Sequence, residues 1–233
     1  NRHPTFTDEA GHSVPLLCVL DLLAYLEEQH VIGAEEKHET FHKLRQAGYA
    51  LILVTPDELE GYLRQVRFDQ DGQIMESAEL RIIRQTLVRI RSLDMVELPT
   101  EARFLEKLQL GCVIVIRRLW ADEALPTEQA AMLSDWVWRH VAPSPLDWAR
   151  NIAEPLQPDD MPEAFARHLA WLLKPMPLNL DRYEAFQIWV EEEILAPLLP
   201  ANADLVDRLV CMVRADIERL SEEFGNGERE ADR

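Results

Sequence analysis

The chain has 233 residues, of which 47% are hydrophobic and only eight are glycine, a composition typical of one large or two small folded domains. Its formal net charge is -18, and both halves are acidic: residues 1–98 carry 10 basic and 17 acidic side chains, and residues 99–233 carry 14 and 25. Neither half has the basic surface expected of a nucleic-acid receptor or of a protein that binds an anionic membrane.

The apolar runs and the cysteines bear on the cellular compartment expected for the protein. The longest uninterrupted apolar runs, residues 14–20 and 111–116, are much shorter than the roughly 20 residues needed to cross a bilayer, so no membrane partner is expected. The three cysteines are scattered and show no CxxC spacing, which favours a reduced, cytoplasmic setting. Because the sequence begins abruptly at Asn1, we expect it to be a piece of a longer protein.

Residues 1–66 have the pattern of a small α/β portion. Apolar residues recur at helical spacing over residues 14–28, and a second, more polar helix is predicted over residues 34–46, with Gly48 where a C-terminal cap is expected. Residues 49–55 form an apolar and β-branched run between a glycine and a proline, which predicts a buried strand. Pro56, followed by two acidic residues, predicts the start of another helix.

The rest of the chain is predicted to be helical. A turn is expected at residues 69–72, and residues 67–224 form a helical extension in which all six tryptophans fall and anchor helix packing. Residues 225–233 are a polar tail that we expect to be frayed. The fold class is therefore mainly α with a small α/β portion. The predicted helices of the extension cover residues 76–93, 101–121, 127–141, 162–173, 181–199 and 203–223.

The second predicted helix carries an HExxH motif, His38-Glu39-x-x-His42. In zinc peptidases this spacing places two histidines on one helix face, and the glutamate activates the metal-bound water. Here Lys37 and Lys43 flank the motif, and the apolar residues of the helix fall on a different sector from the histidines. We therefore disfavour zinc and expect the histidines to lie on a solvated face.

Two adjacent acidic residues, Asp8 and Glu9, follow a possible short strand at the start of the chain. Carboxylates at the end of a strand suit Mg²⁺ or Mn²⁺, hard cations that prefer oxygen ligands and can hold an attacking water. The same pair is also compatible with a solvated turn or the first turn of a helix.

One basic stripe stands out in this acidic chain. In the helix predicted over residues 76–93, Arg81, Arg84 and Arg91 group on the side opposite a buried apolar stripe. Such a stripe can follow a phosphate backbone, and it can equally form ion pairs with neighbouring acidic helices, which we favour. The segment Asp69-Gln-Asp-Gly72 lacks the later ligands of a calcium loop and is interpreted as a turn.

Residues 5–65 resemble the back half of a PIN-like nuclease domain. The resemblance is carried by Thr7-Asp8-Glu9-Ala10 and by the segments at residues 14–26, 31–33 and 44–59, which have the family's acid-bearing turn, "DLL..L" helix, break and helix-to-strand passage. The chain looks most like PIN domains at the C-terminus of large bacterial multidomain proteins with helical repeats. Residues 134–138 and 186–199 look similar to the Trp-containing helical tail of those proteins.

The resemblance implies cleavage of RNA with Mg²⁺ or Mn²⁺ held by three or four clustered acids. By position, Asp8 and Glu9 would match the late acids of that cluster and serve as catalytic residues, with Asp8 also a metal ligand. The family's early acids would lie before Asn1, so half of the metal site would be missing from this chain.

Three functions follow as hypotheses. The first is the C-terminal part of a PIN-like protein that is a metal-dependent ribonuclease in its full-length form and reaches RNA through that form. The second is a non-catalytic helical module that binds upstream domains of the same protein or a separate protein partner. The third, resting on HExxH alone, is a zinc peptidase.

Overall fold

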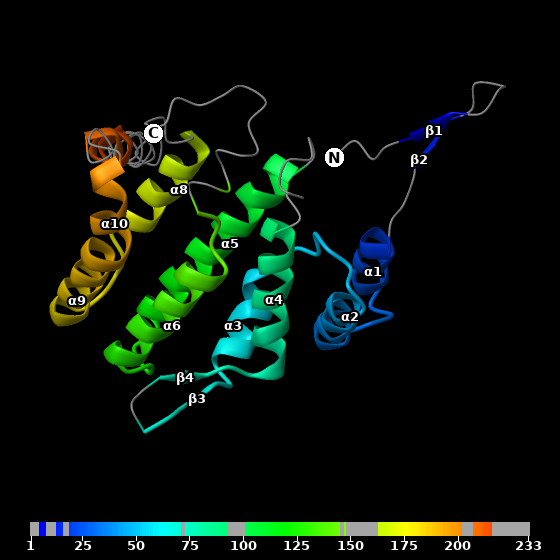
Figure 1. The fold of residues 1–233 in the computed structure, drawn as a ribbon, viewed down its shortest axis with the longest axis horizontal. Coiled ribbons are helices and arrows are strands. Elements are labelled where there is room, and N and C mark those ends of the chain that lie inside the picture. Colours follow the sequence, from blue (N-terminus) through cyan, green and yellow to red (C-terminus); the bar gives the residue numbers. More distant parts are fainter. Residues whose placement is uncertain are drawn as a thin grey trace, which may run out of the picture. The chain divides into compact units, whose positions relative to one another are not determined.

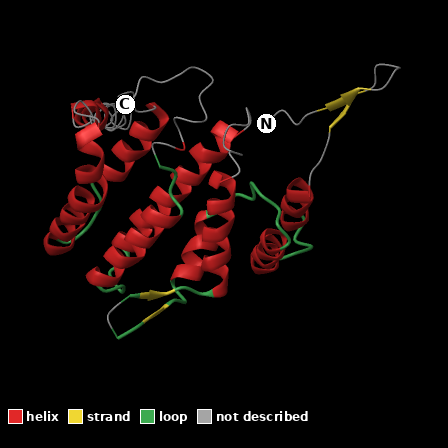
Figure 2. Ribbon diagram, in the orientation of Figure 1, coloured by secondary structure: helices red, strands yellow, loops and turns green. Residues whose placement is uncertain are grey.

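Helices make up most of the described chain, with two short antiparallel hairpins (Figures 1 and 2). The computed structural model describes residues 5–7, 13–15, 19–70, 73–92, 101–144, 147, 163–201 and 207–215. Its backbone divides into two units, Asn1–Ile52 and Leu53–Arg233, called below the first and the second unit. The predicted mainly α fold class is confirmed, whereas the predicted tail at residues 225–233 lies outside the described residues.

The first unit begins with a hairpin. Strands β1 (Thr5–Thr7) and β2 (Ser13–Pro15) pair antiparallel, with Phe6 opposite Val14. A short strand before the acidic pair was predicted; β2 was not, because residues 13–15 continue smoothly into the apolar helical pattern that follows.

Two helices complete the first unit. Helix α1 (Val19–Glu28) and helix α2 (Ala34–Gln46) pack against each other, and Leu23, Phe41 and Ile52 form their small buried cluster. Gly48 has φ of 90°, the left-handed conformation of a helix C-cap, and the following amide of Tyr49 donates to the carbonyl of Leu44 at 3.1 Å. The cap predicted at Gly48 is confirmed.

The strand predicted over residues 49–55 is wrong. These residues pair with neither hairpin of the described chain, and Leu51 has φ of 61°, which interrupts an extended conformation. Ile52 and Val54 are each only 4% exposed, but Ile52 belongs to the core of the first unit and Val54 is buried in the second. The apolar run therefore reflects burial of an irregular connection, not pairing in a sheet.

The first helix of the second unit is α3 (Pro56–Leu63), which our boundary after residue 66 had assigned to the first portion. Proline occupies its first turn, and the hydroxyl of Thr55 accepts a hydrogen bond from the Glu58 amide at 3.2 Å. Helix α3 packs against α4 (Ala78–Ser92) and α5 (Glu101–Ala121), so it belongs to the second unit. Between α3 and α4, strands β3 (Arg67–Phe68) and β4 (Ile74–Met75) pair antiparallel across the predicted turn, of which residues 71 and 72 are not described.

Helix α5 lies at the centre of the second unit and packs against α3, α6 (Thr127–His140) and α8 (Glu163–Leu173) (Figure 1). Its Trp120 is fully buried, with ring centroids 5.3 Å from Phe186 and 6.0 Å from Trp189 of helix α9 (Leu180–Val190). Trp136 is also buried, which confirms that these tryptophans anchor helix packing.

Two arginines donate hydrogen bonds to the backbone carbonyls at the C-terminal ends of helices. Arg182, only 5% exposed, donates to backbone carbonyls at the end of α5 and in the loop that follows: Leu119, Trp120, Asp122 and Leu125. Arg117 does the same for α8, donating to the carbonyls of Trp171, Leu172, Lys174 and Pro175. Helix-terminal carbonyls lack partners within the helix, and a cation there also offsets the helix dipole, so both arginines are structural.

The helix predicted over residues 181–199 is not continuous. After α9 the chain forms a π-helical turn (Glu191–Leu195), followed by α10 (Ala196–Leu198) and a 3-10 turn (Leu199–Ala201). Pro197 explains the change, because its ring would clash with the carbonyl of Glu193 four residues earlier. The amide of Ala196 instead donates to the carbonyl of Glu191, one residue further back than in an α-helix.

Candidate binding groove

The residues predicted from the resemblance are not available for comparison: Asp8 and Glu9 lie outside the described residues. Their roles as ligands of Mg²⁺ or Mn²⁺ therefore stay predictions. Within the described ranges, no group of three or more His, Cys, Asp or Glu side chains is placed to hold a metal ion.

The HExxH motif lies on α2, as expected, with Phe41 and Leu44 of the same helix turned toward the buried cluster. Glu39 is exposed and forms an ion pair with Lys43 at 2.8 Å, whose hydrogen bond and charge lower the pKa of Glu39. His42 is half-buried, and its Nε2 lies 3.1 Å from the side-chain amide nitrogen of Gln46. The glutamate is thus engaged with a lysine, and no third ligand accompanies the histidines within the described chain.

The basic stripe on α4 is largely paired. Arg84 makes two hydrogen bonds to the carboxylate of Glu76, at 2.7 and 2.9 Å, and Arg91 donates to Asp147 at 3.0 Å and to the carbonyl of Ala142 at 3.1 Å. Arg81 is exposed. The prediction of ion pairs is confirmed for Arg84 and Arg91.

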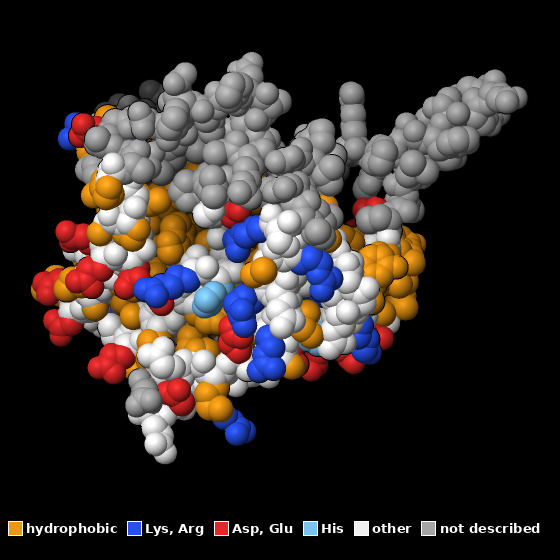
Figure 3. Space-filling view, viewed as in Figure 1, with side chains coloured by type: hydrophobic (Ala, Val, Ile, Leu, Met, Phe, Trp, Pro, Cys, Tyr) orange, Lys and Arg blue, Asp and Glu red, His pale blue; other side chains and the backbone are white. Residues whose placement is uncertain are grey.

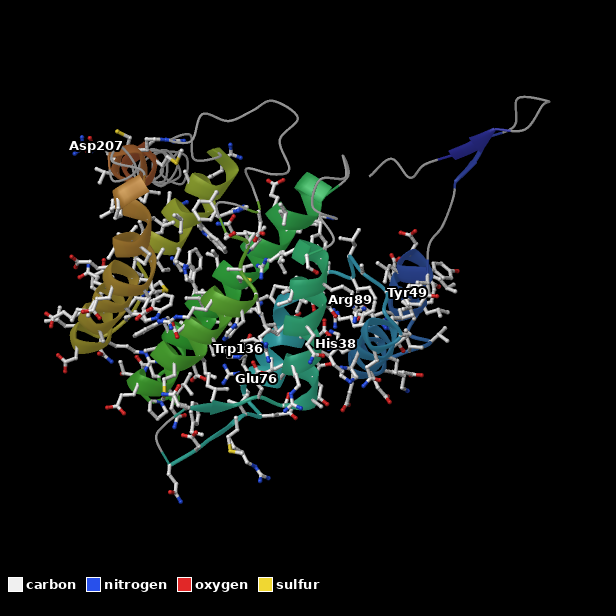
Figure 4. The ribbon with its side chains drawn as sticks, in the orientation of Figure 1. His38, Tyr49, Glu76, Arg89, Trp136 and Asp207 are labelled. Atoms are coloured by element: carbon white, nitrogen blue, oxygen red, sulfur yellow. The ribbon has the colours of Figure 1, made fainter. Side chains whose placement is uncertain are left out.

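The pair formed by Arg84 and Glu76 belongs to the wall of a hollow of about 660 Å³ in the second unit. Figure 4 shows Glu76 beside Trp136, whose indole N–H donates to its carboxylate at 3.1 Å. The hollow is formed by the end of the β3–β4 hairpin, α4, α6, α9 and the π-helical turn. Apolar side chains line it at Ile74, Ala131, Met132, Trp136 and Trp189, and polar ones at Gln73, Glu76, Arg84, Asp135, Arg139, His140 and Glu193.

A second hollow, of about 530 Å³, adjoins the first. Both are lined by Arg139 and Glu193, which form an ion pair at their common border. The second hollow continues along α6 and the π-helical turn to α10, where its walls are largely apolar, with Trp138, Ala142, Pro143, Ile194, Pro197 and Leu198. We call the two hollows together the groove.

The charged groups of the first hollow differ in their environments. The hydrogen bonds from Arg84 hold the pKa of Glu76 below its usual range, and burial lowers the pKa of His140, with the charge of Arg84 adding to the effect. Burial raises the pKa of Asp135; the charge of Arg139 opposes this shift, whereas the neighbouring carboxyl of Glu193 adds to it. Asp135 and Glu193 are thus two interacting carboxyls that share one arginine.

The local sequence explains how the charged side chains of Asp135, Arg139 and Glu193 come together. Asp135 and Arg139 stand four residues apart on α6, so they meet on one face of the helix, with Arg139 Nε 2.7 Å from the Asp135 carboxylate. Glu193 lies in the π-helical turn that Pro197 imposes, and this turn brings it to Arg139 from the other side. Wide helical turns of this kind occur often at functional sites.

Sequence reasoning missed the groove. The only signals for it were the i, i+4 pair on α6 and a proline near the end of a predicted helix, and neither says which helices meet. In the space-filling view, acidic side chains gather over α9 and basic side chains gather over α4 on the same face (Figure 3).

No family model, curated protein or solved structure matches the chain. In the part of the chain that the structure describes, no helix has the length and apolar character that crossing a membrane requires.

Proposed function

We propose that this protein is a helical interaction module whose groove binds an extended segment of a partner protein. The observation that carries the proposal is the adjacency of the two hollows, which share Arg139 and Glu193 in their linings and are both lined partly by aromatic and apolar side chains. Pockets with an apolar lining and a few convergent polar groups are the usual binding sites of proteins.

The two adjacent hollows, of about 660 and 530 Å³, suit an extended polypeptide. Successive side chains of an extended segment point to opposite sides and advance by about 3.3 Å per residue, so every second side chain can enter the groove. Trp136 and Met132 offer apolar contacts in the first hollow, and Trp138 and Pro197 offer them in the second. At the border, the half-exposed Arg139 can exchange its ion pair for hydrogen bonds with the segment.

Filling the groove tests the proposal. Ala131 lines the first hollow from α6, and an arginine there would occupy the space without removing a core side chain. A matched control is Ala124→Arg, because Ala124 is exposed, precedes α6 and lines neither hollow. Random decapeptides displayed on phage are panned on the wild-type protein, and the affinities of the enriched peptides are measured for the three proteins by fluorescence polarisation.

We expect Ala131→Arg to weaken binding at least about tenfold and Ala124→Arg to leave it unchanged, since only the first substitution obstructs the site. Peptides that bind the Ala131→Arg variant as tightly as the wild type would contradict the proposal. Failure to enrich any peptide over an uncoated surface would contradict it as well.

The ribonuclease hypothesis is retained as a second candidate. What motivates it is the resemblance of residues 5–65 to the back half of a PIN-like domain; the strand expected between α2 and α3 is absent. The full-length protein with Mn²⁺ should then cleave single-stranded RNA, and Asp8→Asn should abolish cleavage. Cleavage unchanged by Asp8→Asn would remove the role assigned to that residue.

A further inference from the structure

Two helices of the second unit carry opposite charges on the same face. Helix α4 contains four arginines and one glutamate, whereas α9 and the π-helical turn together contain five acidic residues and one arginine, the buried Arg182. Figure 3 shows the basic side chains over α4 and the acidic side chains over α9 from the same side. This face is therefore divided into a basic part and an acidic part.

The basic part contains cations without partners. Arg81 and Arg89 are exposed and form no ion pair within the described chain, in contrast to Arg84 and Arg91. Eight residues separate the two exposed arginines, so they lie about two helical turns, or roughly 12 Å, apart on α4. Val88, which lies between them in the sequence, is 52% exposed. Helix α4 thus presents two free cations together with an apolar side chain.

The acidic part has the same pattern with the opposite charge. Glu184 and Glu192 are exposed, are also eight residues apart, and form no ion pair with any residue that the structure describes. Ile188, midway between them, is 56% exposed. The spacing of the carboxylates on this helix therefore matches the spacing of the free cations on α4, and each pair is accompanied by an exposed apolar side chain.

A two-fold axis makes such a face complementary to itself. When a surface pairs with the same surface of a second copy, each patch meets the patch on the other side of the axis, and every contact occurs twice. With α4 and α9 on opposite sides of the axis, α4 of each copy faces α9 of the other. Cations then meet carboxylates in both contacts, whereas a pairing of α4 with α4 would bring like charges together.

We propose that this face of the second unit binds the same face of a second copy of the chain, with α4 of each copy against α9 of the other. The exposed arginines of α4 pair with the exposed glutamates of α9, and Val88 packs against Ile188. Both helices help to line the groove, through Arg84 and Trp189, so the second copy competes with the segment proposed to bind there. The inference does not require that segment.

Reversal of charge on each helix tests the inference. One variant carries Arg81→Glu and Arg89→Glu on α4, and the other carries Glu184→Arg and Glu192→Arg on α9 and the π-helical turn. The oligomeric state of the full chain is measured by sedimentation equilibrium over a protein concentration of about 1–100 μM, without peptide. The control combines Arg67→Glu with Arg214→Glu, because both arginines are exposed and lie outside α4.

We expect the wild type to dimerise and each reversal to weaken the dimer at least about tenfold, although the two reversals change the net charge in opposite directions. The control should dimerise like the wild type. An equimolar mixture of the two reversed variants should restore the dimer, because one α4–α9 contact is then native and the other has both of its charges reversed. Raising the salt concentration should weaken the wild-type dimer, since exposed ion pairs are screened.

Several results would overturn the inference. These are a wild-type protein that stays monomeric at every concentration, a dimer that either reversal leaves unchanged, and a mixture that fails to restore the dimer. Assemblies larger than a dimer would overturn the two-fold arrangement, because an open contact does not close. Thermal melting checks the fold of each variant, and Arg89→Glu and Glu192→Arg alone repeat the test where a double variant fails to fold. None of these results bears on peptide binding to the groove, which is measured separately.

Discussion

The two units of this protein differ in how their helices are held. In the first unit, α1 and α2 enclose three buried apolar side chains, and Leu22 and Tyr25 of α1 remain more than half exposed, at 51% and 58%. In the second unit, α5 carries a run of fully buried residues, and Arg182 and Arg117 satisfy the terminal carbonyls of α5 and α8. We infer that the second unit is the more stable one and the natural scaffold for a rigid groove.

Removing Arg182 should weaken the second unit most. Arg182→Met keeps the length of the side chain but leaves four backbone carbonyls without their donor, two of them buried and two part-buried, which should cost about 3–5 kcal/mol of unfolding free energy. Urea denaturation followed by tryptophan fluorescence reports this unit, because all six tryptophans belong to it. Arg214→Met, at an exposed position of the helix at residues 207–215, is the control and should change little.

A loss below about 1 kcal/mol for Arg182→Met would mean that water replaces the guanidinium at the carbonyls. The contrast between the two units would then rest on apolar packing alone.

For the first unit, the corresponding test of stability is Phe41→Ala. Phe41 is 7% exposed, and Lys37 and Arg45 both lie within 6 Å of its ring centroid. Truncating it should cost about 3 kcal/mol, a large part of what so small a core supplies. Native-state hydrogen exchange should show loss of protection in α1 and α2 without loss in α5.

Loss of protection in α5 to the same extent would show that the two units unfold together. The two units would then differ in their packing but would not unfold independently. Phe41→Leu, which retains most of the apolar volume, should have a smaller effect at the same sites.

Acid should destabilise the second unit through His168. This histidine is 8% exposed, its Nδ1 has no hydrogen-bond partner among the described residues, and burial lowers its pKa, with Glu106 opposing the shift. Below an unfolded pKa of about 6.5 the unfolded state binds a proton that the folded state does not, so stability falls as pH decreases. One such group contributes at most about 1.4 kcal/mol between pH 7.5 and 5.5.

His168→Leu should therefore reduce the loss of stability between these two pH values, whatever its effect at pH 7.5. His30→Asn is the control: His30 is exposed, and asparagine tolerates its φ of 56°. An unchanged pH slope in His168→Leu would assign the acid effect to His140, whose pKa is lowered in the same direction.

The sequence predicted the helices of both units far better than their assembly. Amphipathic periodicity located α2 and α5 to the residue and α4, α6 and α8 to within about two residues, because this signal is local. The helices predicted over residues 14–28 and 181–199 were too long, because the first included strand β2 and the second continued past the end of α9. The strand at residues 49–55 was wrong because an apolar run reports burial and not the structure that buries it. The groove escaped prediction because Glu193 reaches Arg139 only through packing of α6 beside α9 and the π-helical turn.

Thr55 lies close to the boundary between the units, and substituting it tests this boundary with the smallest expected loss of stability. Its hydroxyl caps α3, the first helix of the second unit, although the sequence assigned Thr55 to a strand. Thr55→Ala should cost about 1 kcal/mol, and Thr55→Ser, which keeps the hydroxyl, should cost much less. Because the cap belongs to the second unit, the loss should appear in the tryptophan transition, while exchange protection of α1 and α2 stays unchanged. A change confined to α1 and α2 would instead place α3 with the first unit, as the sequence-based boundary after residue 66 had it.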